Sequence, residues 1–472
     1  MEKFIKFLDL SAFKRLMNTK DVYSATKPLY YLSKLLGLAP FSYNKNENHK
    51  AARRLHISTL GTLHSWGMCL LISNFLIFLF ISNVKKEFPK LIIDIVNISD
   101  SYFSSLTVIV SYALCATVNR NKVIKLFQLL NKIDQCLGNT STSFRITGAS
   151  LLLGVSIYLI AHGIGYLVVI VFIPAEAKDY HIQFVYFSIY VVGAVTIMQF
   201  VYSVLLLKDR FEMLNRELIV LFEINDEETL NEKLLNFCQI YSLENKFEQP
   251  VMNKVNANKC IKEEKSNRLE NDYKGKKYKC VGSRKKERIH RLKTLRGIHN
   301  TLCDAAELTN STYQVQVLMD LIGILVEITT CLYLALTYAA QILTCRPTNA
   351  PRWNLLGLYV VWVTLNLSKL LAITISCRSA CRNANYTAVL VHKLMILQPA
   401  DYAAELQIFS QQLLHRKLCF TACGFFLIDF CLMYNMASSV TTYLIILLQY
   451  TGHDIGEDRI FELCNSTSQT TV

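Results

Sequence analysis

Four charged side chains lie within or beside stretches of sequence that are otherwise apolar, and they are well placed to do chemistry. They are Asp320, Glu327, Lys369 and Asp429. Burying an unpaired charge in a bilayer is costly, so such residues commonly contact a ligand or an ion, or pair with each other. Glu327 could face a ligand, and Asp429 could attract cations. The alternative for each is a structural residue that is paired or protonated.

The sequence offers no catalytic or metal-binding set. It has no glycine-rich phosphate loop, no nucleophile elbow and no helix with two metal-binding histidines. Cys377 and Cys381 are one helical turn apart, but no histidine or further cysteine completes a metal site. We therefore expect neither an enzyme nor a bound cofactor or metal.

A polar stripe follows one face of the last apolar stretch. Its members are Asn435, Ser439, Thr442, Ile446 and Gln449. Their spacing places them along one side of one helix. Such a stripe could face water or a partner helix inside the membrane. The alternative is simple helix packing, since Ser and Thr are common where membrane helices touch.

The end of that stretch, Thr442 to Tyr450, reads TYLIILLQY. It resembles the terminal signature of insect gustatory receptors, which is Thr-Tyr, five apolar residues and Gln-Phe, with Tyr450 in place of Phe. In that family the last helix lines the pore of a tetrameric, ligand-gated cation channel. The resemblance implies that Gln449 and Tyr450 lie near the gate and that Ile446 and Thr442 lie deeper along the pore.

Composition indicates a membrane protein that crosses the bilayer several times. The 472 residues are 52% hydrophobic, with a mean hydropathy of +0.27. Apolar runs of about twenty residues recur, the length needed to span a bilayer as a helix. We predict an all-α, polytopic fold with seven transmembrane helices, at about 59–84, 101–119, 149–174, 180–207, 317–341, 354–377 and 422–450. No cleavable signal peptide is expected.

The distribution of charge predicts the orientation. The net charge of +14 could suggest nucleic acid, but with the N-terminus inside, the cytoplasmic segments hold 42 Lys and Arg against 7 outside. Without the long loop 208–312 the balance is still 21 against 7. We therefore expect a cytoplasmic N-terminus and an extracellular C-terminus. No nucleic-acid partner is expected, because aromatic residues do not interleave with the basic ones.

The predicted organisation follows from these spans. Residues 246–296 are strongly basic and poor in apolar residues, which favours disorder; they could bind the anionic inner leaflet or serve only as a linker. The resemblance, which includes the run His299, Leu302, Cys303 and Asp304, implies that residues 205–320 and 378–425 anchor the subunits to one another. The segments are a cytoplasmic 1–58, helices one to four in 59–207, a cytoplasmic loop with helical extensions in 208–316, helices five and six in 317–377, a cytoplasmic anchor loop in 378–421, a pore-lining helix in 422–450, and an extracellular tail in 451–472.

The family resemblance also implies a ligand pocket between the outer halves of helices two to six. Aromatic rings there could stack on a ligand, and histidine or glutamine could give directional hydrogen bonds. The alternative is the ordinary aromatic belt of a membrane interface. The candidates are His162, Tyr166, Gln183, Tyr186, Tyr190, Glu327, Tyr333, Tyr338 and Trp362, together with Tyr158 and Tyr359.

The resemblance thus implies a gustatory receptor that works as a non-selective cation channel in the plasma membrane of sensory dendrites. Its expected partners are membrane lipid, a small-molecule tastant (a sugar, a nucleoside or a bitter compound) and related subunits in a homotetramer or hetero-oligomer. The alternatives are an inverted seven-helix receptor that signals through partner proteins, and a transporter. Asn97 and Asn465 lie in glycosylation motifs predicted to be outside. A disulfide between Cys345 and Cys464, both expected outside, is left open.

Overall fold

The computed structural model of the chain describes residues 22–43, 55–85, 92–138, 154, 156–168, 171, 180–222, 268–344, 351–398 and 400–454. The predictions about a disulfide between Cys345 and Cys464 and about glycosylation at Asn465 fall outside these residues. So does the part of the basic segment that precedes Arg268.

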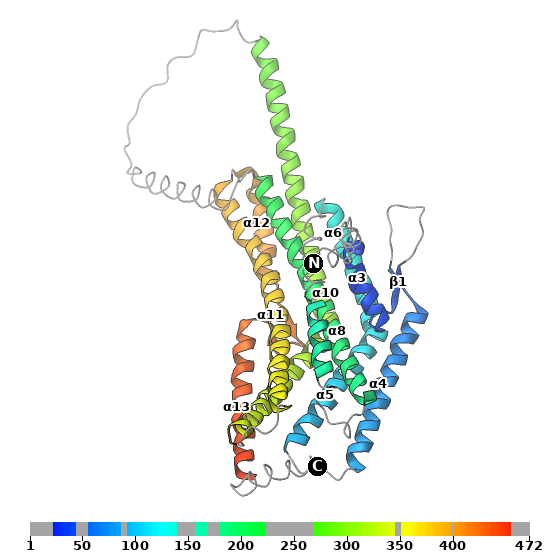
Figure 1. The fold of residues 1–472 in the computed structure, drawn as a ribbon. Coiled ribbons are helices and arrows are strands. Elements are labelled where there is room, and N and C mark those ends of the chain that lie inside the picture. The colour runs from blue at the N-terminus through cyan, green and yellow to red at the C-terminus, as the bar shows by residue number, and fades with distance from the viewer. Residues whose placement is uncertain are drawn as a thin grey trace, which may run out of the picture.

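Long helices run side by side in an elongated bundle (Figure 1). They are α4 (Thr59–Lys85), α5 (Ile92–Leu114), α6 (Arg120–Leu137), α8 (Tyr180–Leu221), α10 (Arg268–Thr344), α11 (Pro351–Leu397), α12 (Ala400–His415) and α13 (Phe430–Asp454). Six helical stretches of the described chain are long and apolar enough to cross a membrane, and Ser156–Val168 forms a shorter apolar helix. The predicted all-α membrane fold is confirmed, and the orientation of its termini stays a prediction.

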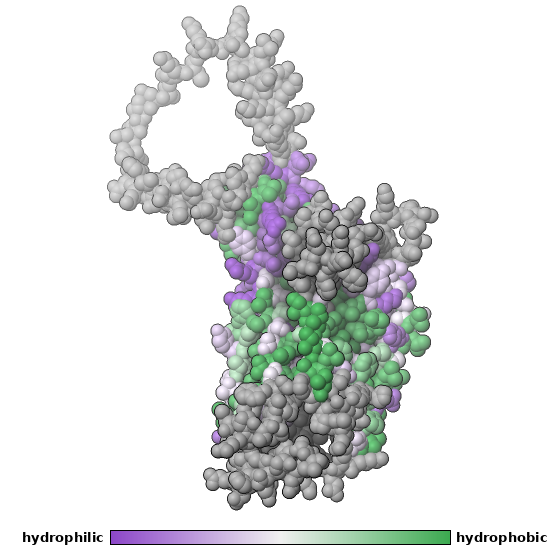
Figure 2. Space-filling view, viewed as in Figure 1, coloured by the Kyte–Doolittle hydropathy of each residue, from purple (hydrophilic) through white to green (hydrophobic). Residues whose placement is uncertain are grey.

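Helix α8 lies at the centre of the bundle and α13 lies at its edge (Figure 1). In the most apolar 18-residue stretch of α8, 67% is buried inside the chain. In the corresponding stretch of α13 only 17% is buried. The core cluster joins α8 to the facing sides of α5, α10 and α11. Apolar side chains are also prominent on the middle of the surface, with hydrophilic ones towards the end where α10 projects (Figure 2). That belt of apolar surface suits a bilayer.

The segments predicted to be cytoplasmic are more helical than the sequence indicated. Residues 268–296 of the basic segment, which we expected to be disordered, form the first part of α10. Their apolar residues repeat at helical spacing, and Leu292 and Leu295 are completely buried. Arg296 pairs with Glu405 of α12 at 3.0 Å, so neighbouring helices neutralise part of the positive charge. The predicted anchor loop 378–421 is likewise mostly the end of α11 and all of α12.

The last transmembrane helix begins at Phe430 and not near residue 422. The preceding residues form a small antiparallel hairpin of β3 (Thr421–Ala422) and β4 (Phe426–Leu427). Its turn contains Cys423 and Gly424, with φ of 51° and 77°. This left-handed conformation suits glycine and is incompatible with a helix. The apolar composition of the segment had suggested a helix, but hairpin strands can be equally apolar.

The described residues before α4, 22–43 and 55–58, pack mainly against α6 and α8. Helix α3 (Val22–Leu35) continues through Pro28, and a hairpin of β1 (Phe41–Tyr43) and β2 (Leu55–Ile57) follows it.

Helix α5 begins at Ile92, before the predicted limit of 101, so Asn97 lies in a helix and not in the expected loop. Between α5 and α6 the chain forms a π-helix, η1 (Cys115–Asn119).

Candidate functional site

Four rings from three helical segments form a cluster around His162. The ring of His162 lies 4.6 Å from that of Trp362, 6.0 Å from that of Tyr190 and 4.4 Å from that of Tyr158. Tyr190 and Trp362 are also in contact, at 5.7 Å. Four of the predicted pocket residues, Tyr158, His162, Tyr190 and Trp362, are therefore brought together.

His162 is the polar centre of this cluster. Its side chain is only 2% exposed, and within the described part of the chain neither Nδ1 nor Nε2 has a hydrogen-bond partner. An unpaired buried polar group costs about 1–3 kcal/mol. An imidazole can donate through one nitrogen and accept through the other, so a bound molecule could satisfy both.

An ion pair crosses from α11 to α10 beside the aromatic cluster. Lys369 Nζ donates to Asp320 Oδ1 at 3.0 Å, and the two side chains are 13% and 7% exposed. Glu327, 8% exposed, lies two turns further along α10. All three line a small cavity of about 30 Å³ that also reaches Tyr190. Asp320 and Lys369 therefore pair with each other, as the structural alternative for these charged residues expects. Glu327 lies where a ligand at the rings would approach it.

Three further predicted pocket residues, Tyr166, Tyr186 and Tyr338, contact rings other than that of His162. Tyr166 packs on Phe187, and Tyr338 stacks on Tyr359 with ring centres 5.1 Å and 5.7 Å apart, respectively. Tyr186 meets Phe75 of α4 at 5.6 Å, Tyr333 is 1% exposed, and the side chain of Gln183 is outside the described set. These residues have the composition of an aromatic belt, and their positions are determined by packing that the sequence alone does not reveal.

Asp429 does not lie inside the last helix. Its Oδ1 accepts hydrogen bonds from the backbone N–H groups of Cys431 and Leu432, at 2.9 and 3.3 Å, and so caps the start of α13. A carboxylate is favoured there by the unpaired N–H groups and the positive end of the helix dipole. The expectation that it lies within the helix and attracts cations from there is corrected.

The polar stripe of α13 lies on a surface that its own chain leaves largely uncovered. Thr442 and Gln449 are exposed, and Ile446 is 41% exposed. The buried face of the same helix is instead formed by Leu432 and Met436, with Val440 above them. The side chain of Tyr450 is outside the described residues.

Three residues of the run that resembles the family, His299, Leu302 and Cys303, are buried in the core of the bundle. His299, 1% exposed, lies 3.8 Å from the Sγ of Cys303, and its Nδ1 lies 3.3 Å from Nε2 of Gln412 on α12. Arg416 donates to Asp304 at 2.7 Å. These contacts fasten α10 to α12 within one chain, and the role of this region between subunits stays a prediction.

In the described part of the chain, six helical stretches long and apolar enough to cross a membrane and a shorter apolar helix indicate a helical membrane protein of the multi-span type. The profile of the family described as 7tm Chemosensory receptor matches residues 26–249 and 254–451, so the chain belongs to that family, among the insect gustatory receptors. Putative gustatory receptor 28a of Drosophila melanogaster is 24% identical over 93% of both chains. Putative gustatory receptor 28b of the same species is 31% identical over 33% of both chains.

Solved structures have the same fold. The insect olfactory receptor OR5 from Machilis hrabei is similar with a TM-score of 0.55 at 13% identity, over 91% of this chain and 98% of that one. The same receptor in complex with eugenol gives a TM-score of 0.53 at 14% identity, over 90% and 97%. At this identity the likeness shows the fold alone.

Proposed function

We propose that this chemosensory receptor is a ligand-gated, non-selective cation channel that senses small-molecule tastants at the plasma membrane of sensory neurons. The observation that carries the proposal is the polar stripe of α13. Its own chain leaves Thr442, Ile446 and Gln449 exposed on a helix otherwise suited to the membrane. Polar groups are poorly solvated by lipid, so this face is best covered by water or by other copies of the helix.

Four copies of α13 arranged around one axis would turn the stripes inward and form a pore. Gln449 and Tyr450 then form the narrow end, and Ile446 and Thr442 lie deeper. A ring of amide and phenol groups has no fixed charge, so weak selectivity among cations follows. Residues 205–320 and 378–425 would hold the four subunits together at their inner ends.

The tastant would bind at the rings around His162. The unpartnered imidazole favours a ligand with hydrogen-bonding groups, and Trp362 and Tyr190 offer flat apolar faces for a sugar or an aromatic ring. Glu327 lines the adjoining cavity and could accept a hydrogen bond from a hydroxyl group. The complex of the related fold with eugenol supports a small molecule as the ligand class.

Contacts already present offer a route from this site to the pore helix. The ion pair Lys369–Asp320 joins α11 to α10 next to the rings. Further along α11, Thr374 Oγ1 donates to Sδ of Met433 on α13 at 3.5 Å. A ligand that changes the packing of α10 against α11 would therefore move α13, and with it Gln449.

The test is whole-cell current from this chain expressed alone and exposed to a panel of sugars, nucleosides and bitter compounds. We expect a ligand-evoked cation current whose selectivity or block changes in Gln449→Ala. In His162→Phe, which keeps an aromatic ring, the ligand concentration for half-activation should rise about five-fold or more, the effect of one lost hydrogen bond. Tyr166→Phe is the control, because Tyr166 lies outside the cluster.

Two outcomes would contradict the proposal. Current that survives Gln449→Ala with permeation, block and gating unaltered would mean that α13 is not the pore. Ligand responses carried only by partner proteins, with no current from the purified chain in a protein-free bilayer, would favour an inverted receptor without its own pore.

A further inference from the structure

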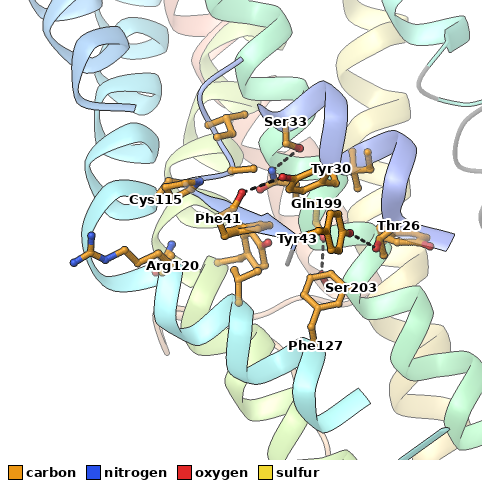
Figure 3. A pocket seen from close by; sticks show the side chains of 18 residues that line it. Thr26, Tyr30, Ser33, Phe41, Tyr43, Cys115, Arg120, Phe127, Gln199 and Ser203 are labelled. Atoms are coloured by element: carbon orange, nitrogen blue, oxygen red, sulfur yellow. Dashed lines mark hydrogen bonds between the residues drawn. The ribbon is translucent and has the colours of Figure 1, made fainter. Parts of the chain in front are cut away.

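A second cavity lies at the inner side of the bundle and shares no lining residue with the His162 cluster or with the cavity of the ion pair. Its volume, taken as the space that the centre of a water-sized molecule can occupy, is about 50 Å³. Helix α3 and strand β1 cover one side, and α6, α8 and α10 form the rest (Figure 3). Tyr202, which lines it, lies about 18 Å along α8 from Tyr190, at about 1.5 Å per residue.

The π-helix η1 positions a buried amide at this cavity. π-Helical turns are rare, and they are frequent at functional sites. Asn119 is the last residue of η1, its side chain is 4% exposed, and its Nδ2 has no hydrogen-bond partner within the described chain. The side-chain amide of an asparagine this deeply buried normally has hydrogen-bond partners. The Nδ2 of Asn119 lacks one in the described chain, and a ligand could supply it.

A second unpartnered donor faces the same space from α8. Tyr202 is 3% exposed, and among the described residues its hydroxyl contacts no hydrogen-bonding group. Arg120 Nε is a third buried donor on the walls without a partner in the described chain, whereas Gln199 and Tyr30 are paired. Gln199 Nε2 donates to Ser33 Oγ at 2.7 Å, and the hydroxyl of Tyr30 donates to the carbonyl of Phe41 at 3.1 Å (Figure 3). Asn119, Tyr202 and Arg120 therefore each present a donor that the described chain leaves without a partner.

The walls are mostly aromatic, and Arg120 is the charged residue that the described part of the chain contributes to them. Rings of Tyr30, Phe41, Tyr43 and Phe127 line the cavity, and Arg120 extends away from the other labelled side chains (Figure 3). Burial raises the pKa of Tyr43 to about 12, so this phenol stays neutral at physiological pH. The many rings favour apolar surface on a ligand, and the unpartnered donors favour an acceptor oxygen.

We propose that this cavity is a second ligand site, for a neutral, mainly apolar molecule whose carbonyl or ester oxygen accepts hydrogen bonds from Asn119 and Tyr202. Ester oxygens of this kind occur both in free small molecules and in the lipids of the inner leaflet. The site goes beyond the proposed tastant site, because it is separate from it. A molecule bound here would contact α3, η1, α8 and α10 together, and would change how readily these helices move against each other.

Photolabelling of the purified full-length chain in lipid nanodiscs tests the proposal. One arm uses methyl azidobenzoate, a neutral aromatic ester, and the other a phosphatidylcholine with a photoreactive acyl chain; labelled peptides are mapped by mass spectrometry. We expect labelling of the cavity walls above that of lipid-facing α4. Unlabelled methyl benzoate should compete in the first arm. Labelling by the lipid probe alone would identify a leaflet lipid as the occupant.

Matched variants separate binding from folding. Val123→Phe fills the cavity and should abolish wall labelling, whereas Val118→Phe, at a residue 52% exposed, should not. Tyr202→Phe should weaken apparent binding about five-fold, as for one lost neutral hydrogen bond, without lowering the ligand-free unfolding temperature. Labelling no stronger than on α4, or equal in Val123→Phe and the parent chain, would overturn the proposal. So would a lowered ligand-free unfolding temperature in Tyr202→Phe, because the hydroxyl would then have a structural partner.

Discussion

At the scale of single residues, Lys369 and Asp320 are expected to be coupled in their effect on stability, because each neutralises the charge of the other. Both groups are largely buried, and removal of one partner leaves an uncompensated charge in the bundle. We expect Lys369→Met to lower the free energy of unfolding in detergent by about 3–5 kcal/mol. The double variant Asp320→Leu/Lys369→Met should recover most of that loss, because both charges of the pair are removed together. Denaturant unfolding of the two single variants and the double variant measures the coupling.

An exposed pair provides the comparison. Arg216 and Glu212 also form an ion pair, but their side chains are 67% and 39% exposed. Arg216→Met should therefore change stability by less than about 0.5 kcal/mol. Equal losses in Arg216→Met and Lys369→Met would mean that the transmembrane pair is solvated and not a structural link between α10 and α11.

The sequence located these charges but could not identify which residues pair. Asp320 and Lys369 were recognisable because they interrupt apolar stretches, yet they are 49 positions apart and meet only through the packing of α10 on α11. His162 was likewise recognisable as a polar residue in a helix. That its ring lies among those of Tyr190 and Trp362 follows from the relative rotation of three helices, which periodicity in a single chain does not determine.

At the scale of elements, the start of α13 depends on a helix cap. Asp429 accepts hydrogen bonds from two N–H groups of the first turn. We expect Asp429→Ala to destabilise the protein by about 1 kcal/mol, because these N–H groups lose their acceptor. Asp429→Asn, which keeps an acceptor oxygen, should lose much less. Thermal unfolding in detergent measures both, and equal losses would indicate that the charge, and not the cap, stabilises this end of the helix.

The elements also show why some boundaries could be predicted and others could not. Helix α4 ends at Lys85, one residue from the predicted limit, because an apolar run gives way to charged residues there. The start of α13 was wrong by eight residues, because the hairpin before it is also apolar. Its position is instead determined by tertiary contacts: Asn310 Oδ1 accepts from the N–H of Thr421 at 3.1 Å, and Phe420 packs on Phe200.

At the scale of the whole molecule, the uncovered stripe of α13 predicts an assembly in which four stripes meet. A cysteine placed at Gln449 should then lie in a ring of four thiols around the axis. We expect Gln449→Cys channels to be blocked by cadmium ions at concentrations that leave the parent chain unaffected, because several thiolates can share one soft metal ion.

The control for this test is Leu448→Cys, which lies about 100° further round the same helix and away from the stripe. Its channels should be insensitive to cadmium. The mass of the purified complex, measured in parallel, should equal four chains. Block at both positions would mean that the helix is rotated or that the ion reaches it from outside the pore. A monomeric mass, with no block at Gln449→Cys, would contradict the assembly, because a single polar stripe cannot enclose a water-filled path across the bilayer.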